Sequence, residues 1–565
     1  MTTTDTPPEE RKRTMAAAGR PRRRPGIWVL IAVLLALLLL AIIVLPQLRI
    51  VTAAFSDGHG GATLAHFAEF FTTARFTEAL WHSVVVSLAA GLLSCLVGIP
   101  TAYLLAQYDL PRRSLFLTLA TMATVSPPFL GAYAWVMLLG RGGILTDVLP
   151  LPFDTIIGPG GIIWVTIWAT QSMTFLIAYD TFRSIDPSLD EAAASVGSNP
   201  WRTRLRIVLP LAVPALVTGF YTAAMKIFAD FGTPLIIGGG YRMLPVEVYN
   251  EFLSEVSTNP ALASSASLVM LAVAGATLAV QQWALRRRTY ASVGVRTRPL
   301  QPVGRAQKLL MTGWLCLVFF LSFVPHLVVI GTSFLTWQTG ILTWTPTLAN
   351  YRQLFAEDLG TILTSFVLAG IGCVLCILVG VLTAYITVRR RYRVLAPALN
   401  IMVMIPYILP GTVLAIGLIL SFNSAPLILT GTATIIVLVY LTRRLPYFMK
   451  SVEAAMTQVH PALEEAAISV GAKPLRAFRQ ATLPAIRPAV VSGGTVAFLQ
   501  MITELSATIM VYAVPFVTMT VVIFNNAVQP GSPFGVASAM TVVLMVSVYV
   551  PLYFVRRRFS DLRTS

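Results

Sequence analysis

Charged residues, cysteine and histidine are all scarce in this chain of 565 residues. Only 12% of the residues are charged, and the sequence contains 4 cysteines and 5 histidines. That balance leaves too little polar surface for a soluble domain of this length. The histidines are scattered, and Cys373 and Cys376 fall within an apolar run, where we expect them to pack as small hydrophobic side chains. The sequence therefore predicts no metal site.

The motifs of enzyme chemistry are also missing. The chain has no paired catalytic carboxylates in a soluble domain, no Ser/His/Asp arrangement and no Gly-x-x-x-x-Gly-Lys-Ser/Thr loop that would hold a nucleotide. We therefore expect neither an enzyme nor a bound cofactor. A net charge of +17 could suggest nucleic acid, but membrane topology and contact with anionic lipid headgroups explain it. We expect membrane lipid as a partner and no nucleic acid.

Long apolar runs are what the chain has in abundance. It is 56% hydrophobic, and its mean hydropathy is +0.75. Residues 27–45 are uncharged and long enough to span the hydrocarbon core of a bilayer. A basic, Pro-rich tail precedes them, and the run is longer than that of a secretory signal and lacks a cleavage site of small residues. We therefore predict an uncleaved first membrane helix.

The apolar runs form two sets of six, which predicts an all-α membrane protein of about 12 transmembrane helices in two homologous halves. A cytoplasmic basic tail (residues 1–26) precedes the first half (27–285), and a cytoplasmic linker (286–308) joins it to the second half (309–565). The predicted spans are residues 27–48, 82–106, 114–140, 160–180, 211–236, 262–285, 309–334, 361–388, 394–421, 426–442, 488–512 and 535–555.

Positive charge orients these spans. Most of the 41 lysines and arginines, including Arg443 and Arg444, fall on the side that holds both termini and the linker, and Lys226 lies within a span. Five arginines fall on the opposite side, namely Arg49, Arg75, Arg141, Arg242 and Arg352. By the positive-inside rule the crowded side is the cytoplasm. Both termini are therefore expected to be cytoplasmic.

One polar segment occurs twice, 274 residues apart. Residues 186–197 read Asp-Pro-Ser-Leu-Asp-Glu-Ala-Ala-Ala-Ser-Val-Gly, and residues 460–471 read His-Pro-Ala-Leu-Glu-Glu-Ala-Ala-Ile-Ser-Val-Gly. The register holds without a gap through a Leu-Pro pair, Leu209-Pro210 or Leu483-Pro484. Both copies lie in predicted cytoplasmic loops, 183–210 and 451–484. A hydrophobic chain that repeats one polar loop indicates contacts outside the lipid.

Each copy carries the signals of a short helix with a fixed end. In the first copy, Pro187 suits the first turn, Asp186 can cap it, and Gly197 ends the helix by accepting a left-handed conformation. We expect about ten residues of helix, with one apolar stripe along it. The stripe comprises Leu189, Ala192, Ala193 and Val196. The alternative is a surface helix that only tucks under the bundle.

At these residues the chain resembles a known family. Glu-Ala-Ala, three residues, Gly and a later Leu-Pro resemble the cytoplasmic coupling loop of binding-protein-dependent ABC importer permeases, and the whole chain resembles two such permeases fused. The resemblance implies the type I ABC importer permease fold, the bacterial inner membrane, two separate ATPase subunits that hydrolyse ATP, and an external solute-binding protein. It assigns the ATPase contact to Glu191, Ala192, Ala193, Gly197, Glu465, Ala466, Ala467 and Gly471.

The fused arrangement and the segment Ala-Asp-Phe-Gly-Thr-Pro at residues 229–234 are similar to bacterial ferric iron permeases. Permeases for polyamines, thiamine, sulfate or phosphonates remain alternatives. The offset of 274 places Glu504 opposite Asp230, and an acid within a span usually faces a cavity or a partner. We expect both acids, with Lys226, to line the translocation path. The alternative for Asp230 is local neutralisation by Lys226, four residues earlier on one helix.

Proline and glycine interrupt the third and ninth predicted spans, at residues 126–131 and 405–411. Such breaks free backbone groups and permit the bending that alternating access needs, although they also serve simple packing. A secondary transporter of twelve spans is the rival class. It would use coupling ions and would have no use for two matched Glu-Ala-Ala helices.

Overall fold

The computed structural model describes residues 26–564, apart from residues 127, 147, 149–153, 254–258, 287–298, 339–340 and 530–533. The predicted tail, except Gly26, and most of the predicted linker lie outside the described residues. Helices dominate the described chain, which confirms the all-α prediction. A hairpin of two antiparallel strands, β1 (Leu335–Gln338) and β2 (Ile341–Pro346), was not predicted.

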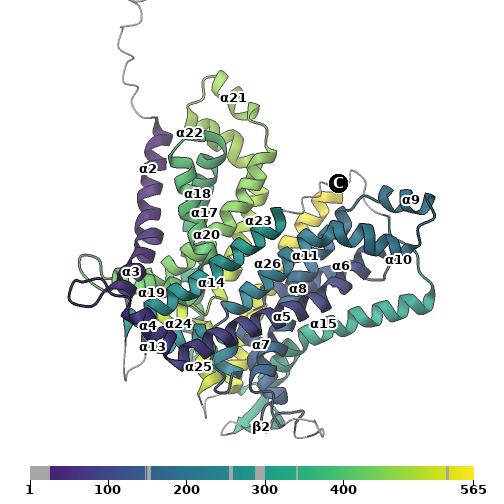
Figure 1. Ribbon diagram of the computed structural model, residues 1–565, viewed down its shortest axis with the longest axis horizontal. Helices are drawn as coiled ribbons and strands as arrows, with labels where there is room; N and C mark the ends of the chain where they lie inside the picture. Colours follow the sequence, from purple (N-terminus) through teal and green to yellow (C-terminus); the bar gives the residue numbers. More distant parts are fainter. Residues whose placement is uncertain are drawn as a thin grey trace, which may run out of the picture.

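The helices of the first half run in chain order from α2 to α14 (Figure 1). They are α2 (Ile27–Leu39), η2 (Leu40–Val44), α3 (Leu45–Phe55), α4 (Ala65–Thr72), α5 (Ala74–Gln107), α6 (Arg113–Val125), α7 (Pro128–Leu139), α8 (Pro159–Ser184), α9 (Ser188–Ser195), α10 (Pro200–Thr203), η3 (Arg204–Val208), α11 (Leu209–Phe228), α12 (Gly232–Ile237), α13 (Leu244–Leu253) and α14 (Pro260–Arg286). The η elements are π-helical turns within longer helices.

The second half repeats this order after residue 299. Its helices are α15 (Arg305–Ser333), α16 (Ala349–Glu357), α17 (Leu359–Tyr385), η4 (Ile386–Arg390), α18 (Leu395–Ile408), α19 (Gly411–Phe422), α20 (Ala433–Gln458), α21 (Ala462–Ser469), α22 (Pro474–Ala477), η5 (Phe478–Thr482), α23 (Leu483–Ile502), α24 (Thr508–Val511), α25 (Met519–Val528) and α26 (Phe534–Thr564). Thus α9 and α21 are the two copies of the repeated polar segment.

Within the described residues, 9 helices are long and apolar enough to cross a membrane, or up to 11 if each of two bent pairs is one span. The pairs are α6 with α7, bent by 98°, and α18 with α19, bent by 117°. They coincide with the proline and glycine breaks of the third and ninth predicted spans. A count of 12 is not confirmed, because α20, at the tenth predicted span, carries Arg443, Arg444, Lys450 and Glu453.

The first long helix of each half packs on the other half. The helix formed by α2, η2 and α3 lies between α14 of its own half and α18 with α19 of the second half, and α15 lies between α26 and the first-half helices α6 and α7. Figure 1 shows α2 beside α18 at the left and α15 along α5 and α6 at the right. Aromatic pairs join the halves on both sides, with ring centroids 4.3 Å apart for Trp28 of α2 and Tyr385 of α17, and 5.6 Å apart for Phe116 of α6 and Phe319 of α15. This exchange ties the two halves into one body.

Candidate functional site

The repeated polar segment forms a short capped helix in each half, as predicted. Each helix has 8 residues, two fewer than expected. In the first half, the backbone N–H of Ser188 donates to Asp186 Oδ1 at 2.9 Å. In the second half, the N–H of Ala462 donates to His460 Nδ1 at 3.2 Å, so histidine replaces the carboxylate as the group that satisfies the first turn. In Figure 1, α21 lies at the top of the molecule and α9 lies at its upper right.

Glycine ends both helices in the left-handed conformation, with φ of +76° at Gly197 and +94° at Gly471. In each case the residue after the glycine donates its N–H to the carbonyl five residues earlier. These bonds are 2.9 Å from Ser198 to Ala193 and 3.0 Å from Ala472 to Ala467. This pattern is a Schellman motif, which satisfies the last carbonyls and fixes the direction of the chain.

The apolar stripe of the repeated helices is only partly covered by the chain itself. Ala193 is buried, but Val196 and its counterpart Val470 are 83% and 87% exposed. Glu191 and Glu465 are also exposed. The same outward position holds for Ala192, Gly197, Ala466 and Gly471, whereas Ala467 is half-buried. A helix that only tucked under the bundle would bury its stripe, so this alternative does not fit the exposed valines.

An arginine–tyrosine cluster anchors α21, and the sequence analysis missed it. Glu464 is buried, and its Oε1 accepts hydrogen bonds from the Tyr385 hydroxyl and from Arg390 Nη2, the latter at 2.9 Å. Its Oε2 accepts a bond of 3.1 Å from the Thr482 hydroxyl. Arg390 also lies over the ring of Trp28, at 5.4 Å from its centroid. The first described helix, α2, therefore meets α21 through this cluster.

The first half builds a related cluster from different positions. Arg204, from the turn after α10, donates to the hydroxyl of Tyr108 at 2.7 Å and lies 5.8 Å from the ring centroid of Tyr103. Tyr103 and Tyr385 belong to the matching Thr-Ala-Tyr segments that end α5 and α17. In the second half the arginine, Arg390, comes from the turn after Tyr385, whereas in the first half Arg204 comes from the segment after α9.

A cavity of about 430 Å³ lies between the two halves. Helices α6, α7, α8, α11 and α14 line it from the first half, and α18, α20 and α23 line it from the second. Both bent pairs contribute, through Phe129 and Leu409 among others. The cavity brings together all three residues predicted for the translocation path, Lys226, Asp230 and Glu504, and it adds Arg443 and Arg444.

Asp230 and Glu504 lie at breaks in the chain rather than inside continuous helices. The predicted spans 211–236 and 488–512 are wrong at their C-terminal ends, because α11 ends at Phe228 and α23 ends at Ile502. Asp230 Oδ1 accepts the N–H of Gly232 at 3.1 Å, and Glu504 Oε1 accepts the N–H of Ala507 at 3.2 Å. Each carboxylate thus satisfies backbone N–H groups at the start of the next short helix, which gives it a structural role beside any role in transport.

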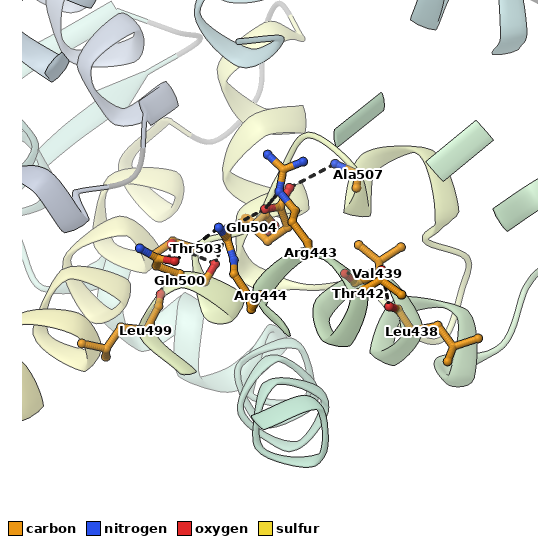
Figure 2. A network of polar contacts seen from close by, with 11 residues as sticks. Leu438, Val439, Thr442, Arg443, Arg444, Leu499, Gln500, Thr503, Glu504 and Ala507 are labelled. Carbon is orange, nitrogen blue, oxygen red and sulfur yellow. Dashed lines mark hydrogen bonds and ion pairs between the residues drawn. The ribbon is translucent and has the colours of Figure 1, made fainter. Parts of the chain in front are cut away.

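Two arginines of α20 pair with Glu504 (Figure 2). Arg443 Nε and Arg444 Nη2 each lie 2.7 Å from Glu504 Oε2. Arg444 also donates to the backbone carbonyl of Gln500 at 3.0 Å. The Glu504 side chain is only 3% exposed, so the pair is well removed from bulk water.

The first half has no matching pair of arginines. The offset of 274 puts Ala169 and Thr170 opposite Arg443 and Arg444, and Lys226 opposite Gln500. Lys226 interacts through space with Asp230, but within the described residues no ion pair of 4.0 Å or less joins them. The predicted local neutralisation is therefore not a direct salt bridge.

The positive-inside rule gave the wrong location for Arg443 and Arg444. The predicted tenth span ends at residue 442, which puts Arg443 and Arg444 on the cytoplasmic side, whereas α20 continues past them and they line the cavity. The repeat itself held the signal that could have found them. Their counterparts Ala169 and Thr170 fall in the middle of the fourth predicted span.

Comparison with known proteins identifies the repeated architecture. The family profile described as "Binding-protein-dependent transport system inner membrane component" matches residues 98–290 and again residues 376–562, together more than half of the chain. The two matches correspond to the two halves and include both copies of the repeated helix, α9 and α21.

Relatives of two kinds align with the chain. A putative ferric transport system permease protein FbpB 1 of Haemophilus influenzae is 28% identical over 497 residues, 85% of this chain and 77% of the relative. The ferric transport system permease protein FbpB of Actinobacillus pleuropneumoniae is 27% identical over 534 residues, 92% of this chain and 76% of the relative. A putative 2-aminoethylphosphonate transport system permease protein PhnU of Salmonella paratyphi A is 27% identical over 286 residues, 49% of this chain and 95% of the relative.

Proposed function

Because the chain belongs to the family of binding-protein-dependent transport system inner membrane components, we propose that it forms the complete solute path of an importer driven by separate ATPase subunits. The observation that carries this proposal is the pair of coupling helices, α9 and α21. Each has a first turn satisfied by the preceding side chain, a Schellman end and a partly exposed apolar stripe, and both lie in the upper part of the view in Figure 1. These are the features of a rigid docking element whose partner is another protein.

The two coupling helices support a stoichiometry of one permease chain to two ATPase subunits. We assign the contacts to Glu191, Ala192 and Gly197 in one half and to the matching residues Glu465, Ala466 and Gly471 in the other. Ala193 and Ala467 face the body of the protein more than the outside, so we assign them to the base of the contact. A solute-binding protein on the opposite face would deliver the solute.

Ferric iron is the solute that we propose. Two relatives whose names state ferric transport cover most of this chain, including both halves. A phosphonate is the second candidate, because a relative named for 2-aminoethylphosphonate transport aligns with half of the chain and because cationic side chains outnumber acidic ones around the cavity. A secondary carrier is not supported by membership of a family whose transport depends on a binding protein.

The proposal is tested by purifying the chain with its ATPase subunits and reconstituting the complex in proteoliposomes. Native mass measurement is expected to give one permease chain and two ATPase subunits. Uptake of radioactive iron is expected to require both ATP and the loaded binding protein. Uptake that follows an ion gradient without ATP, or a complex with two copies of this chain, would contradict the proposal.

A further inference from the structure

The charges around the cavity set what kind of solute it can hold. Lys226, Arg443 and Arg444 line it together with Asp230 and Glu504, which leaves one positive charge in excess. Both acids already have partners, since Asp230 caps the turn at Gly232 and Glu504 binds two arginines. Within the described residues, no group of three or more His, Cys, Asp or Glu side chains could hold a metal ion. A bare trivalent cation would therefore meet a positive field and no free ligand set.

The cationic groups, in contrast, retain free donors. Arg443 approaches Glu504 with its Nε, and in the described residues its two terminal amino groups have no hydrogen-bond partner (Figure 2). The Lys226 ammonium likewise has no hydrogen bond or close ion pair within the described chain. Gly411, at the start of α19, makes room for the Arg443 guanidinium, because a Cβ atom at that position would clash with Arg443 Nη1.

We infer that this cavity recognises an oxyanion group, such as a phosphate, phosphonate or carboxylate, through Arg443 and Lys226. The planar fork of arginine donors matches such groups, and the interaction strengthens where water is excluded. The solute therefore crosses either as an anion itself or, when it is ferric iron, together with a negatively charged oxygen ligand. This inference rests on the proposed function, in which the cavity is part of the solute path.

Binding to the purified full-length chain tests the inference without any ATPase. Inorganic phosphate and methylphosphonate are titrated in detergent, and binding is measured by calorimetry and by the shift in unfolding temperature. Both are expected to bind, and Arg443→Gln and Lys226→Gln are expected to weaken binding at least tenfold. Arg443→Lys is expected to keep a larger share of the affinity than Arg443→Gln, because it keeps the charge but loses the fork.

The variants and controls keep the result interpretable. Lys226→Gln is expected to fold, because the second half places Gln500 at the matching position. Arg352→Gln removes an exposed arginine of α16, far in the sequence from every lining residue, and is expected to bind as the wild type does. Equal oxyanion binding by the wild type, Arg443→Gln and Lys226→Gln, or no binding by the wild type, would overturn the inference. Binding of hexaamminecobalt(III), a trivalent cation without oxygen ligands, that is lost in Glu504→Gln would also overturn it.

A double-label uptake experiment separates the two sources of the oxyanion. The reconstituted importer is supplied with iron-55 and phosphorus-32 phosphate. Uptake of both labels in a fixed ratio assigns the oxyanion as a ligand of iron, and uptake of phosphorus-32 without iron assigns it as the solute. Iron uptake at full rate with no oxyanion present overturns the inference while the proposed function stands. Loss of ATP dependence, in contrast, counts against the proposed function and leaves the binding result untouched.

Discussion

Adjacent glutamates in α21 have opposite environments. Glu465 is exposed, whereas Glu464 is buried and accepts bonds from Tyr385, Arg390 and Thr482. The exposed acid is free to meet a partner, and the buried acid holds the helix on the membrane domain. Sequence reasoning identified Glu465 from its motif, but it did not single out Glu464 or Arg390, because the linear motif does not show which of two adjacent acids faces inward.

Arg390→Ala is expected to loosen α21 without affecting membrane insertion. Removal of the guanidinium leaves the Glu464 carboxylate with two hydroxyl donors and no cation, at a cost of about 1–3 kcal/mol. Transport and stimulation of the ATPase by the binding protein should fall several-fold in the reconstituted complex. Arg393→Ala, which removes an exposed arginine three residues away, is the matched control. Equal activity of the two variants would show that the cluster does not position the coupling helix.

The C-terminal ends of α9 and α21 require glycine for conformational reasons. Nothing lies within 4 Å of a Cβ atom built at Gly197 or Gly471, so space does not require glycine there. The positive φ requires glycine instead. For a residue with a side chain, the left-handed conformation costs about 1–2 kcal/mol of free energy, and for a β-branched residue it costs more.

Gly197→Val and Gly471→Val are therefore expected to uncouple the transporter. The change alters the direction in which the chain leaves the helix, while the spans and the outer face remain as they are. Membrane insertion should be normal, and ATP-driven uptake with stimulated ATP hydrolysis should fall sharply. Gly197→Asn and Gly471→Asn are the controls, since asparagine tolerates the left-handed region. Wild-type transport by both valine variants, singly and together, would refute the assignment of these loops to coupling.

Hydropathy predicted the existence of most long helices, but it could not place their ends near the cavity. The residues after Asp230 read Phe-Gly-Thr-Pro-Leu-Ile-Ile and are almost as apolar as the helix before them. A hydropathy pattern therefore continues through a turn that the carboxylate caps. The proline and glycine signals marked where α6–α7 and α18–α19 break, but they do not specify an angle, and the bends are 98° and 117°.

At the scale of the whole molecule, each half of the chain supplies one copy of the repeated elements. The first long helix of each half packs on the other half, and both halves line the cavity. Each half also carries one copy of the repeated short helix, α9 or α21. The repeat and the positive-inside rule together predict that both termini lie on the side of α9 and α21.

A topology reporter fused after Ser565, or inserted in the linker between residues 286 and 308, is expected to indicate the cytoplasm. The physical reason is the clustering of lysine and arginine on that side of the chain. A fusion beside Arg352, between α15 and α17, should give the opposite signal and serves as the control. A periplasmic signal at Ser565 or in the linker would contradict the orientation.

The exchange of first helices also dictates an order of events during synthesis. The helix from α2 to α3 leaves the ribosome first, but α18 and α19, which cover one side of it, are made more than 300 residues later. Until α18 and α19 are made, the side of the α2–α3 helix that they will cover faces lipid. In the same way, the surfaces of α6 and α7 that contact α15 remain uncovered until α15 is made. Each half needs a helix of the other half to complete its packing. We therefore expect the two halves to finish folding together, late in synthesis, rather than one after the other.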